Sequence, residues 1–205
     1  MEQRSDEWFT ARLGKVTASR VADIMARTKS GYSASRAKYM AQLLCERLTG
    51  QKEDSYQSAA MQRGTELEGK ARAVYLLETG NDVTETGLVD HPTIAMSAAS
   101  PDGLVNDDGL IEIKCPETHT HLEFIKSGKP KSNYMQQMQW QMACTGRQWC
   151  DFVSYDDRLP EYLAYKCVRI PRDDALIAEM EAEVSEFLAE LDLEVKQLGA
   201  MKHDS

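Results

Sequence analysis

The chain has 205 residues, 42% hydrophobic and 28% charged, a composition typical of a globular domain with a sizeable core. No run is long and apolar enough to span a bilayer, and residues 1–7 lack the apolar segment of a signal peptide. None of the five cysteines forms a Cys-x-x-Cys pair, which argues against a zinc ribbon or an iron–sulfur cluster. An odd number of cysteines without a signal peptide predicts reduced cytoplasmic thiols.

The formal net charge of −9 is distributed unevenly along the chain. Residues 1–50 carry nine Lys and Arg against five Asp and Glu, whereas residues 171–205 carry three against ten. We therefore expect the N-terminal third to face phosphate groups and the acidic C-terminal helix to face elsewhere. Metal-binding carboxylates would also lower the formal charge without repelling phosphates once the ions are bound.

The first predicted helix has Ser5 or Asp6 as its N-cap. Trp8 and Arg12 are four residues apart and therefore share one face of this helix. The guanidinium of Arg12 is a planar fork suited to a phosphate group. The plainer interpretation is that Arg12 pairs with an acidic side chain of the same domain.

A second predicted helix, residues 20–25, follows Thr17 and Ser19. Hydroxyls and free backbone N–H groups at a helix N-terminus bind anions, so these residues are candidates for the same phosphate site. The alternative is that one of them only caps the helix. Residues 27–39 form a polar, basic loop with two tyrosines, which either follows a DNA backbone and stacks on unpaired bases or is a mobile surface loop.

Two longer helices follow, predicted at residues 35–48 and 58–78 from the spacing of their apolar side chains. In the second of these, Gly64 would allow another backbone to approach closely. Glu66 and Glu68 are two residues apart and point to well-separated faces, so both cannot reach one site. Spacing alone does not select one of them.

Predicted strands at residues 83–89 and 94–99 lead into a β-hairpin at residues 100–114. Asn106 to Gly109 supply its turn, because Asn, Asp and Gly tolerate the positive φ angles that tight turns need. Apolar residues flank the turn on both sides, as expected for two paired strands.

The second strand of this hairpin places two charged residues on one face. Side chains alternate along a strand, so Glu112 and Lys114 share a face, beside a strand that opens with Asp102. Ile111 and Ile113 mark the opposite face as buried. Carboxylates at such positions are ligands that Mg²⁺ takes, and a lysine beside them can hold an attacking water or offset negative charge in the transition state. The alternative is a solvated hairpin face with an ordinary Glu–Lys pair.

In the helix predicted after the hairpin, Tyr134, Gln137 and Gln141 lie on one side, and three methionines on another side are expected to be core. The elements predicted for the rest of the chain are a short helix at residues 119–126, a helix at residues 133–144 capped by Ser132 or Asn133, strands at residues 149–155 and 162–170, and a helix at residues 173–198.

At the hairpin the chain resembles a known family. Pro101-Asp102 followed by Glu112-Ile113-Lys114 matches the PD-(D/E)XK nuclease signature. The longer string Ser-Pro-Asp-Gly-Leu, followed by Glu-x-Lys-Cys-Pro, is similar to the lambda exonuclease or YqaJ-type viral recombinase family of phage-type alkaline exonucleases. Three more blocks fit this family, residues 8–19, 64–72 and 134–140, so the resemblance spans most of the chain.

The resemblance implies a single α/β domain of 205 residues with a mixed central sheet flanked by helices. The basic helices in residues 1–50 would bind the DNA end, residues 58–170 would form the catalytic core, and residues 173–198 would form the C-terminal helix.

The resemblance also assigns roles to residues at the hairpin. It implies Asp102, Glu112 and the carbonyl of Ile113 as metal ligands. It selects Glu68 rather than Glu66 as a third acid, which binds the metal directly or through water. Lys114, supported by Gln137, would then position and activate the nucleophile.

A pocket for a DNA 5′-phosphate would be built from Arg12, Ser19 and Ser100. The chain departs from the family at Thr120, where lambda exonuclease has a second phosphate-binding arginine. His119, His121 and Lys131 are the candidates to replace that arginine, and the sequence does not select one of them.

The implied activity is 5′-to-3′ degradation of one strand of duplex DNA from an end, with two Mg²⁺ ions that Mn²⁺ can replace. The remaining 3′ overhang would pass to a single-strand annealing protein. We expect a homotrimer without membrane association, encoded by a phage or prophage and located in the bacterial cytoplasm. The alternatives are a structure-specific or restriction-type endonuclease of the same superfamily and a non-catalytic protein that binds DNA ends.

Overall fold

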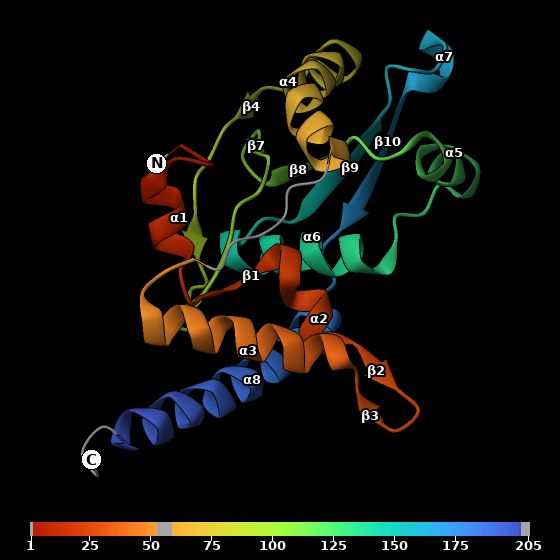
Figure 1. Cartoon of the computed structure of the whole chain (residues 1–205). Coiled ribbons are helices and arrows are strands. Elements are labelled where there is room, and N and C mark those ends of the chain that lie inside the picture. Colours follow the sequence, from red (N-terminus) through yellow and green to blue (C-terminus); the bar gives the residue numbers. More distant parts are fainter. Residues whose placement is uncertain (1, 53–58, 202–205) are drawn as a thin grey trace.

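A five-stranded mixed sheet lies at the centre of the structure, a computed structural model that describes residues 2–52 and 59–201 (Figure 1). Its strand order is β10-β9-β8-β7-β4, with β8 and β9 parallel and the other neighbours antiparallel. This confirms the predicted mixed α/β fold. The strands are β4 Val83–Thr84, β7 Gly103–Val105, β8 Gly109–Lys114, β9 Trp149–Tyr155 and β10 Tyr165–Pro171.

Two smaller sheets accompany the central one. They contain β1 Val16–Thr17, β6 Ser97–Ala99 and β5 Val89–Asp90 in one sheet, and β2 Arg27–Thr28 with β3 Gly31–Tyr32 in the other. The prediction of one strand at residues 83–89 is therefore wrong: β4 pairs with β7, whereas β5 pairs with β6. The chain changes sheets between them, which a local pattern of alternating side chains does not reveal.

The helices largely follow the predicted ranges, and the predicted start at residue 58 lies outside the described residues. Two details are corrected. Residues 161–164 are helical rather than part of a strand, and the N-cap of α6 is Lys131 without a side-chain cap, rather than Ser132 or Asn133. The helices are α1 Asp6–Arg12, the 3₁₀ helix η1 Ala18–Arg20, α2 Val21–Met25, α3 Ala34–Thr49, α4 Ala59–Thr79, α5 Thr118–Ser127, α6 Ser132–Thr145, α7 Glu161–Ala164 and α8 Asp174–Ala200.

Helices cover both faces of the central sheet. On one face α4 packs Ala71 and Tyr75 against Ile111 and Val153. On the other face, side chains of α5 and α6 pack against Leu110 and its neighbours on β9. A further core joins α2, α3, α6 and α8, which cross beneath the sheet in Figure 1. Among the described residues, no helix is long and apolar enough to cross a membrane.

The central hairpin is held in register by its turn and by a tryptophan. Asn106 adopts the positive φ expected for the turn, at 46°. Gly109 is required at the start of β8, because a side chain there would collide with the ring of Trp149 on the neighbouring strand. Residues 110–113 are all buried, so β8 has no solvated face and that alternative is wrong.

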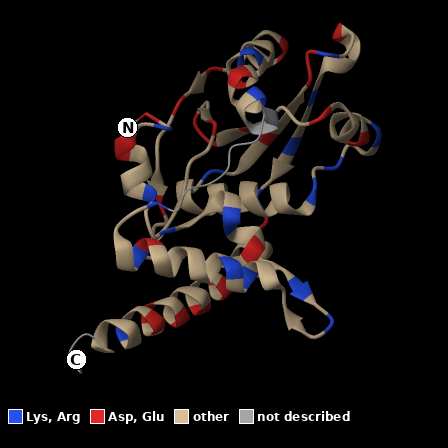
Figure 2. Ribbon diagram, viewed as in Figure 1, with Lys and Arg blue, Asp and Glu red and all other residues tan. Residues whose placement is uncertain are grey.

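The acidic helix α8 neutralises much of the basic N-terminal third. Arg27, Arg36 and Arg47 pair with carboxylates of α8, which lie along its length in Figure 2. The two tyrosines of residues 27–39 are also engaged: Tyr32 contacts Arg27, Arg36 and Glu183, and Tyr39 is buried. The Tyr39 ring is therefore unavailable to an unpaired base, whereas the Tyr32 ring is 39% exposed and already contacts two arginines.

Candidate active site

Asp102 lies at the start of the central hairpin, immediately before β7. Its Oδ2 accepts a hydrogen bond of 2.7 Å from the backbone N–H of Ile113 on β8. This bond crosses the hairpin and fixes the carboxylate beside the Glu112-Ile113-Lys114 segment. The hairpin therefore brings together the two halves of the signature found in the sequence.

Glu112 projects from β8 into the protein and is 1% exposed. Its Oε1 accepts a hydrogen bond of 2.7 Å from Gln137 and lies 2.5 Å from Nζ of Lys114. Its Oε2 accepts a hydrogen bond of 2.7 Å from Gln141. A buried carboxylate is costly unless it is paired and hydrogen-bonded, and these three groups supply both compensations. Gln137 thus reaches Lys114 through the Glu112 carboxylate that they share.

The surroundings of Asp102 and Lys114 change the pKa of each of these two groups. Burial, followed by the charge of Glu112, raises the pKa of Asp102 well above its ordinary value. Burial alone would lower the pKa of Lys114, but the carboxylates of Glu112 and Asp102 outweigh burial and raise it. Lys114 is therefore a cation at neutral pH, able to hold a water or a phosphate oxygen.

Glu68 lies in the same cleft as Asp102 and Lys114, a cleft of about 600 Å³ between α1, α4 and the hairpin. Its carboxylate is already bound by two arginines, Arg4 at 2.6 Å and Arg72 at 3.0 Å. Arg72 also donates to the backbone carbonyl of Asp102 at 3.1 Å, so it joins α4 to the hairpin. Glu66 is exposed, as expected for the glutamate not selected.

The donor set suits a hard divalent cation. Within residues 2–52 and 59–201, no three His, Cys, Asp or Glu side chains are gathered closely enough to form a metal site as they stand. Asp102 and Glu112 are nevertheless close enough for the charge of Glu112 to raise the pKa of Asp102, with Lys114 as the nearby cation. A divalent cation would offset that surplus of negative charge, and carboxylate oxygens are the ligands it prefers.

Arg12 lines a second, neighbouring cleft of about 380 Å³. The Arg12 guanidinium stacks 4.1 Å from the Trp8 ring and donates hydrogen bonds of 3.4 Å to Ser100 and Thr17. Ser19 lines the same cleft as Arg12, so one predicted phosphate ligand shares the cleft of Arg12 and another, Ser100, is hydrogen-bonded to it. The side chains of Thr17 and Ser19 do not cap the helices that follow them.

No carboxylate lies within ion-pair distance of Arg12 among the described residues. Burial lowers the pKa of the Arg12 guanidinium, and the charges of Tyr39 and Glu46 only partly oppose this. A half-buried cation without a paired anion is a favourable binding site for an anion. The part of the chain that the structure describes therefore offers no support for the interpretation that Arg12 pairs with an acid of its own domain.

The candidates for replacing the second arginine differ in their surroundings. His121 is fully buried, with its ring nitrogens 2.6 Å from Oγ of Ser154 and 2.8 Å from the carbonyl of Leu163. His121 is thus part of the core and unavailable to a phosphate, and His119 is exposed on α5. Lys131 lines a cavity together with Lys114 and Thr120.

The sequence reasoning missed four polar residues of the site, Arg4, Lys52, Arg72 and Gln141. Gln141 had a usable signal, because it lies one helical turn after Gln137 on the same side of the helix. Arg72 had a similar signal, because it lies four residues after Glu68 and therefore shares a face of the helix with it. Arg4 and Lys52 reach the cleft from distant segments and left no local signal.

We expect Gln141→Leu to lower both stability and activity, because Glu112 would lose one of its two amide donors. A hydrogen bond to a charged group contributes about 1.5–3 kcal/mol, so unfolding free energy should fall by about 2 kcal/mol. Urea denaturation measures this. Gln136→Leu, on another side of the same helix, is the matched control. An unchanged midpoint for Gln141→Leu would mean that this bond does not hold Glu112.

The mixed sheet, with Asp102 at the hairpin and Glu112 and Lys114 on β8, defines a fold and site of the PD-(D/E)XK nuclease class. The family model of the YqaJ-like viral recombinase domain matches residues 7–148, and the chain belongs to this family. A comparison with the curated proteins gives no match.

Solved structures agree with this assignment. The chain is similar to an alkaline exonuclease from Laribacter hongkongensis, with 66% identity, a TM-score of 0.92, and coverage of 98% of this chain and 99% of that one. The same enzyme in complex with dAMP matches at 67% identity, with the same TM-score and coverage. A phage-related exonuclease from Haemophilus somnus 129PT shares the fold, with a TM-score of 0.71, 19% identity, and coverage of 90% and 96%.

Proposed function

We propose that this protein is a Mg²⁺-dependent exonuclease that degrades one strand of duplex DNA 5′ to 3′ from an end. The observation that carries the proposal is the contact of Arg12, which pairs with no carboxylate among residues 2–52 and 59–201, with Ser100. Ser100 lies two residues before Asp102 in the chain. We call the carboxylates of Asp102 and Glu112 the acidic centre. An anion site close to this centre suits a terminal phosphate held near the bond to be cut. The 66% identity to an alkaline exonuclease over nearly the whole chain supports the nuclease class.

The metal would be held by Asp102, Glu112 and the carbonyl of Ile113, with Glu68 reaching it directly or through water. Two Mg²⁺ ions are expected, and Mn²⁺ should replace them. When bound, the metal supplies Lewis-acid stabilisation of the phosphate and an activated water. Engagement of Glu68 requires it to exchange contacts with Arg4 and Arg72 or to act through a water.

Each residue then has a defined task. Lys114, kept cationic by its carboxylate neighbours, orients the water and offsets charge on the phosphate. Gln137 and Gln141 hold Glu112 in place for the metal and for Lys114. Arg12, Ser19 and Ser100 bind the terminal 5′-phosphate, so that each cut creates a new end that refills the same pocket.

The discriminating experiment follows digestion of a linear duplex labelled at either the 5′ or the 3′ end, with Mg²⁺. A 5′-to-3′ exonuclease releases the 5′ label first and leaves covalently closed circular DNA intact. Cutting of the closed circle would favour an endonuclease of the same superfamily. Binding of ends without digestion by the intact protein would favour a non-catalytic end-binding protein.

We expect Arg12→Ala to shrink the preference for 5′-phosphorylated over 5′-hydroxyl ends by about tenfold, because a charge-assisted contact is lost. Paired digestion of both substrates by each protein measures this. Arg27→Ala is the control, since that arginine is paired with α8. If Arg12→Ala keeps the full preference of the natural protein, Arg12 is not the phosphate ligand.

The assembly and the partner are also part of the proposal. A homotrimer would keep the enzyme on its DNA, and a single-strand annealing protein would take up the 3′ overhang. Met138 and Met142 of α6 and most of the large apolar side chains of α8 are buried within the domain, which leaves few of them for subunit contacts. Light scattering that reports a monomer at micromolar concentration would refute the trimer.

A further inference from the structure

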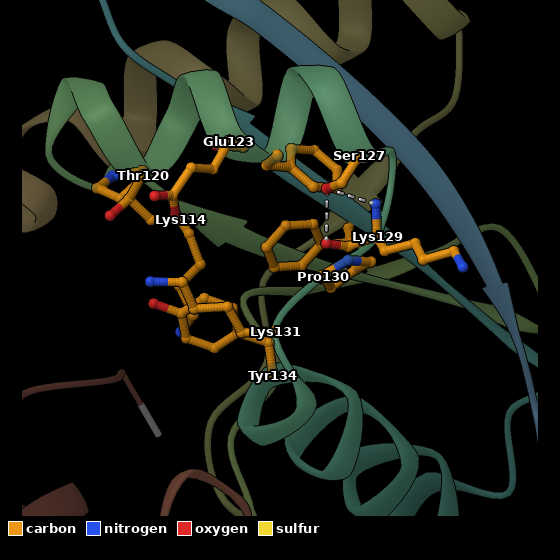
Figure 3. A pocket seen from close by; sticks show the side chains of 12 residues that line it. Lys114, Thr120, Glu123, Ser127, Lys129, Pro130, Lys131 and Tyr134 are labelled. Carbon is orange, nitrogen blue, oxygen red and sulfur yellow. Dashed lines mark hydrogen bonds between the residues drawn. The ribbon is translucent and has the colours of Figure 1, made fainter.

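A separate cavity of about 120 Å³ shares three residues with the active-site cleft, namely Lys114, Pro116 and Tyr134. It lies between β8, β9, α5 and the start of α6. Figure 3 shows Thr120 and Glu123 on α5 facing Lys114 and Tyr134 across it. The cavity is far smaller than the cleft, so it has room for a ring system but not for a stretch of duplex. We call it the side cavity.

The deep wall of the side cavity is flat and aromatic. Tyr134 stacks on Phe152, with ring centroids 5.6 Å apart and planes at 27°. Phe124 meets Phe152 edge-on at 5.0 Å. Phe124 and Phe152 are 6% and 2% exposed, which fixes the wall, whereas Tyr134 remains partly exposed to both the side cavity and the cleft. Such a surface suits a planar apolar group.

The rim of the side cavity is polar and cationic. Thr120 and Glu123 line it with groups that donate or accept hydrogen bonds, and Lys114 lies 5.2 Å from the centroid of the Tyr134 ring. Lys129 and Lys131 add positive charge, although Lys129 extends away from the other labelled side chains in Figure 3. An occupant should therefore combine a flat face, a hydrogen-bonding edge and a nearby negative charge.

A nucleobase attached to its phosphate has these three features. We propose that the side cavity receives the nucleobase of one nucleotide adjoining the scissile phosphate, stacked on Tyr134 and hydrogen-bonded along its edge at Thr120 or Glu123. This inference rests on the proposed nuclease function. Stacking on an aromatic side chain tolerates every base, which suits an enzyme that must digest any sequence.

The occupied side cavity would also help to position the cut. Lys114 lines both the side cavity and the active-site cleft. A base in the side cavity and a phosphate at the acidic centre would therefore lie on opposite sides of the Lys114 side chain. Tyr134 is on this view a binding and positioning residue, because it touches the base rather than the reacting atoms. Its loss should raise KM more than it lowers kcat.

Two variants and two controls test the inference with linear duplex and Mg²⁺. The substrates carry a normal or an abasic nucleotide at the first or second position of the cut strand. Tyr134→Leu removes the flat wall, Thr120→Trp fills the side cavity, and Tyr134→Phe keeps the stacking. Tyr162→Leu, on a tyrosine that is 82% exposed on α7, is the remote control.

We expect the unmodified protein to show a KM about tenfold higher for the abasic duplex at one of the two positions. Tyr134→Leu and Thr120→Trp should raise KM for the normal duplex and abolish the difference. Tyr134→Phe should retain the difference between normal and abasic duplex, and Tyr162→Leu should behave like the unmodified protein. Equal KM values for normal and abasic ends at both positions would overturn the proposal.

A binding measurement separates this inference from the nuclease proposal. With Ca²⁺ in place of Mg²⁺, a 2-aminopurine base at the occupied position should lose fluorescence on binding to the unmodified protein and keep it with Tyr134→Leu. Loss of fluorescence on binding, without any digestion in Mg²⁺, would refute the proposed nuclease activity but support binding of a base in the side cavity. Digestion without any loss of fluorescence at either position would refute base binding in the side cavity and leave the proposed nuclease activity intact.

Discussion

Asp102→Asn and Lys114→Ala should each reduce DNA cleavage by at least about 100- to 1000-fold. Asp102 would be lost as a charged metal ligand, and Lys114 as the cation that orients the water. Asp102→Asn should stay folded, because the amide oxygen can still accept the hydrogen bond from the N–H of Ile113 and the repulsion from Glu112 disappears. Rates on a linear duplex with saturating Mg²⁺ measure the effect.

An exposed carboxylate and an exposed lysine elsewhere in the chain provide matched controls. Asp107→Asn changes an exposed carboxylate in the turn of the same hairpin, and Lys126→Ala removes an exposed lysine at the end of α5. Both should cleave DNA like the unmodified protein. Ca²⁺ should support DNA binding but poorly support cleavage, because its looser coordination misplaces the water. Substantial activity of either Asp102→Asn or Lys114→Ala would refute the assignment of the hairpin to the catalytic site.

The largest loss of stability is expected for Asp156→Ala, away from the acidic centre. The side chain of Asp156 is 0% exposed and contacts Arg63 at 3.1 Å, Arg158 at 2.8 Å and the hydroxyl of Thr118 at 2.6 Å. Removing it takes one carboxylate partner from each of two arginines and leaves the Thr118 hydroxyl without its acceptor at a buried site, so the free energy of unfolding should fall by about 3 kcal/mol. Chemical denaturation at pH 7 measures this value.

The contribution of Asp156 should also depend on pH with a defined sign. Burial alone would raise the pKa of Asp156, but hydrogen bonds from Arg158 and Thr118 outweigh burial and lower it. A lowered folded-state pKa gives stability that is present above the ordinary value of 3.8 and is lost as the pH falls below it. The difference between the unmodified protein and Asp156→Asn should therefore narrow as the pH is lowered from 5 to about 2.

The neighbouring Asp157 is the control for this prediction. It is 31% exposed and pairs with Arg63 and Lys70, so Asp157→Asn should cost less than about 1 kcal/mol. A similar loss in both variants would mean that general charge, rather than the buried network, stabilises this region.

Arg158 also donates to the carbonyl of Pro116, two residues after Lys114. Asp156→Ala should therefore loosen the segment that borders the cleft.

Local chemistry in the sequence determined the elements that carry the site. Turn residues and alternation predicted the hairpin, and spacing placed Glu112 and Lys114 on one face. Ser5 caps α1, and β9 runs from Trp149 to Tyr155, as predicted. Caps, turns and periodicity depend on neighbours within a few residues, so one sequence is sufficient to predict them.

The surroundings of those elements were decided only by the tertiary structure. Glu112 is buried because α6 covers its face of the sheet, and this is why two glutamines rather than water hold it. Arg27, Arg36 and Arg47 are paired with carboxylates because α3 and the segment before it pack along the acidic helix α8, a neighbour that no local pattern in the sequence reveals. Such facts depend on which distant segments meet, and the free energy of a charge depends on what those segments place around it.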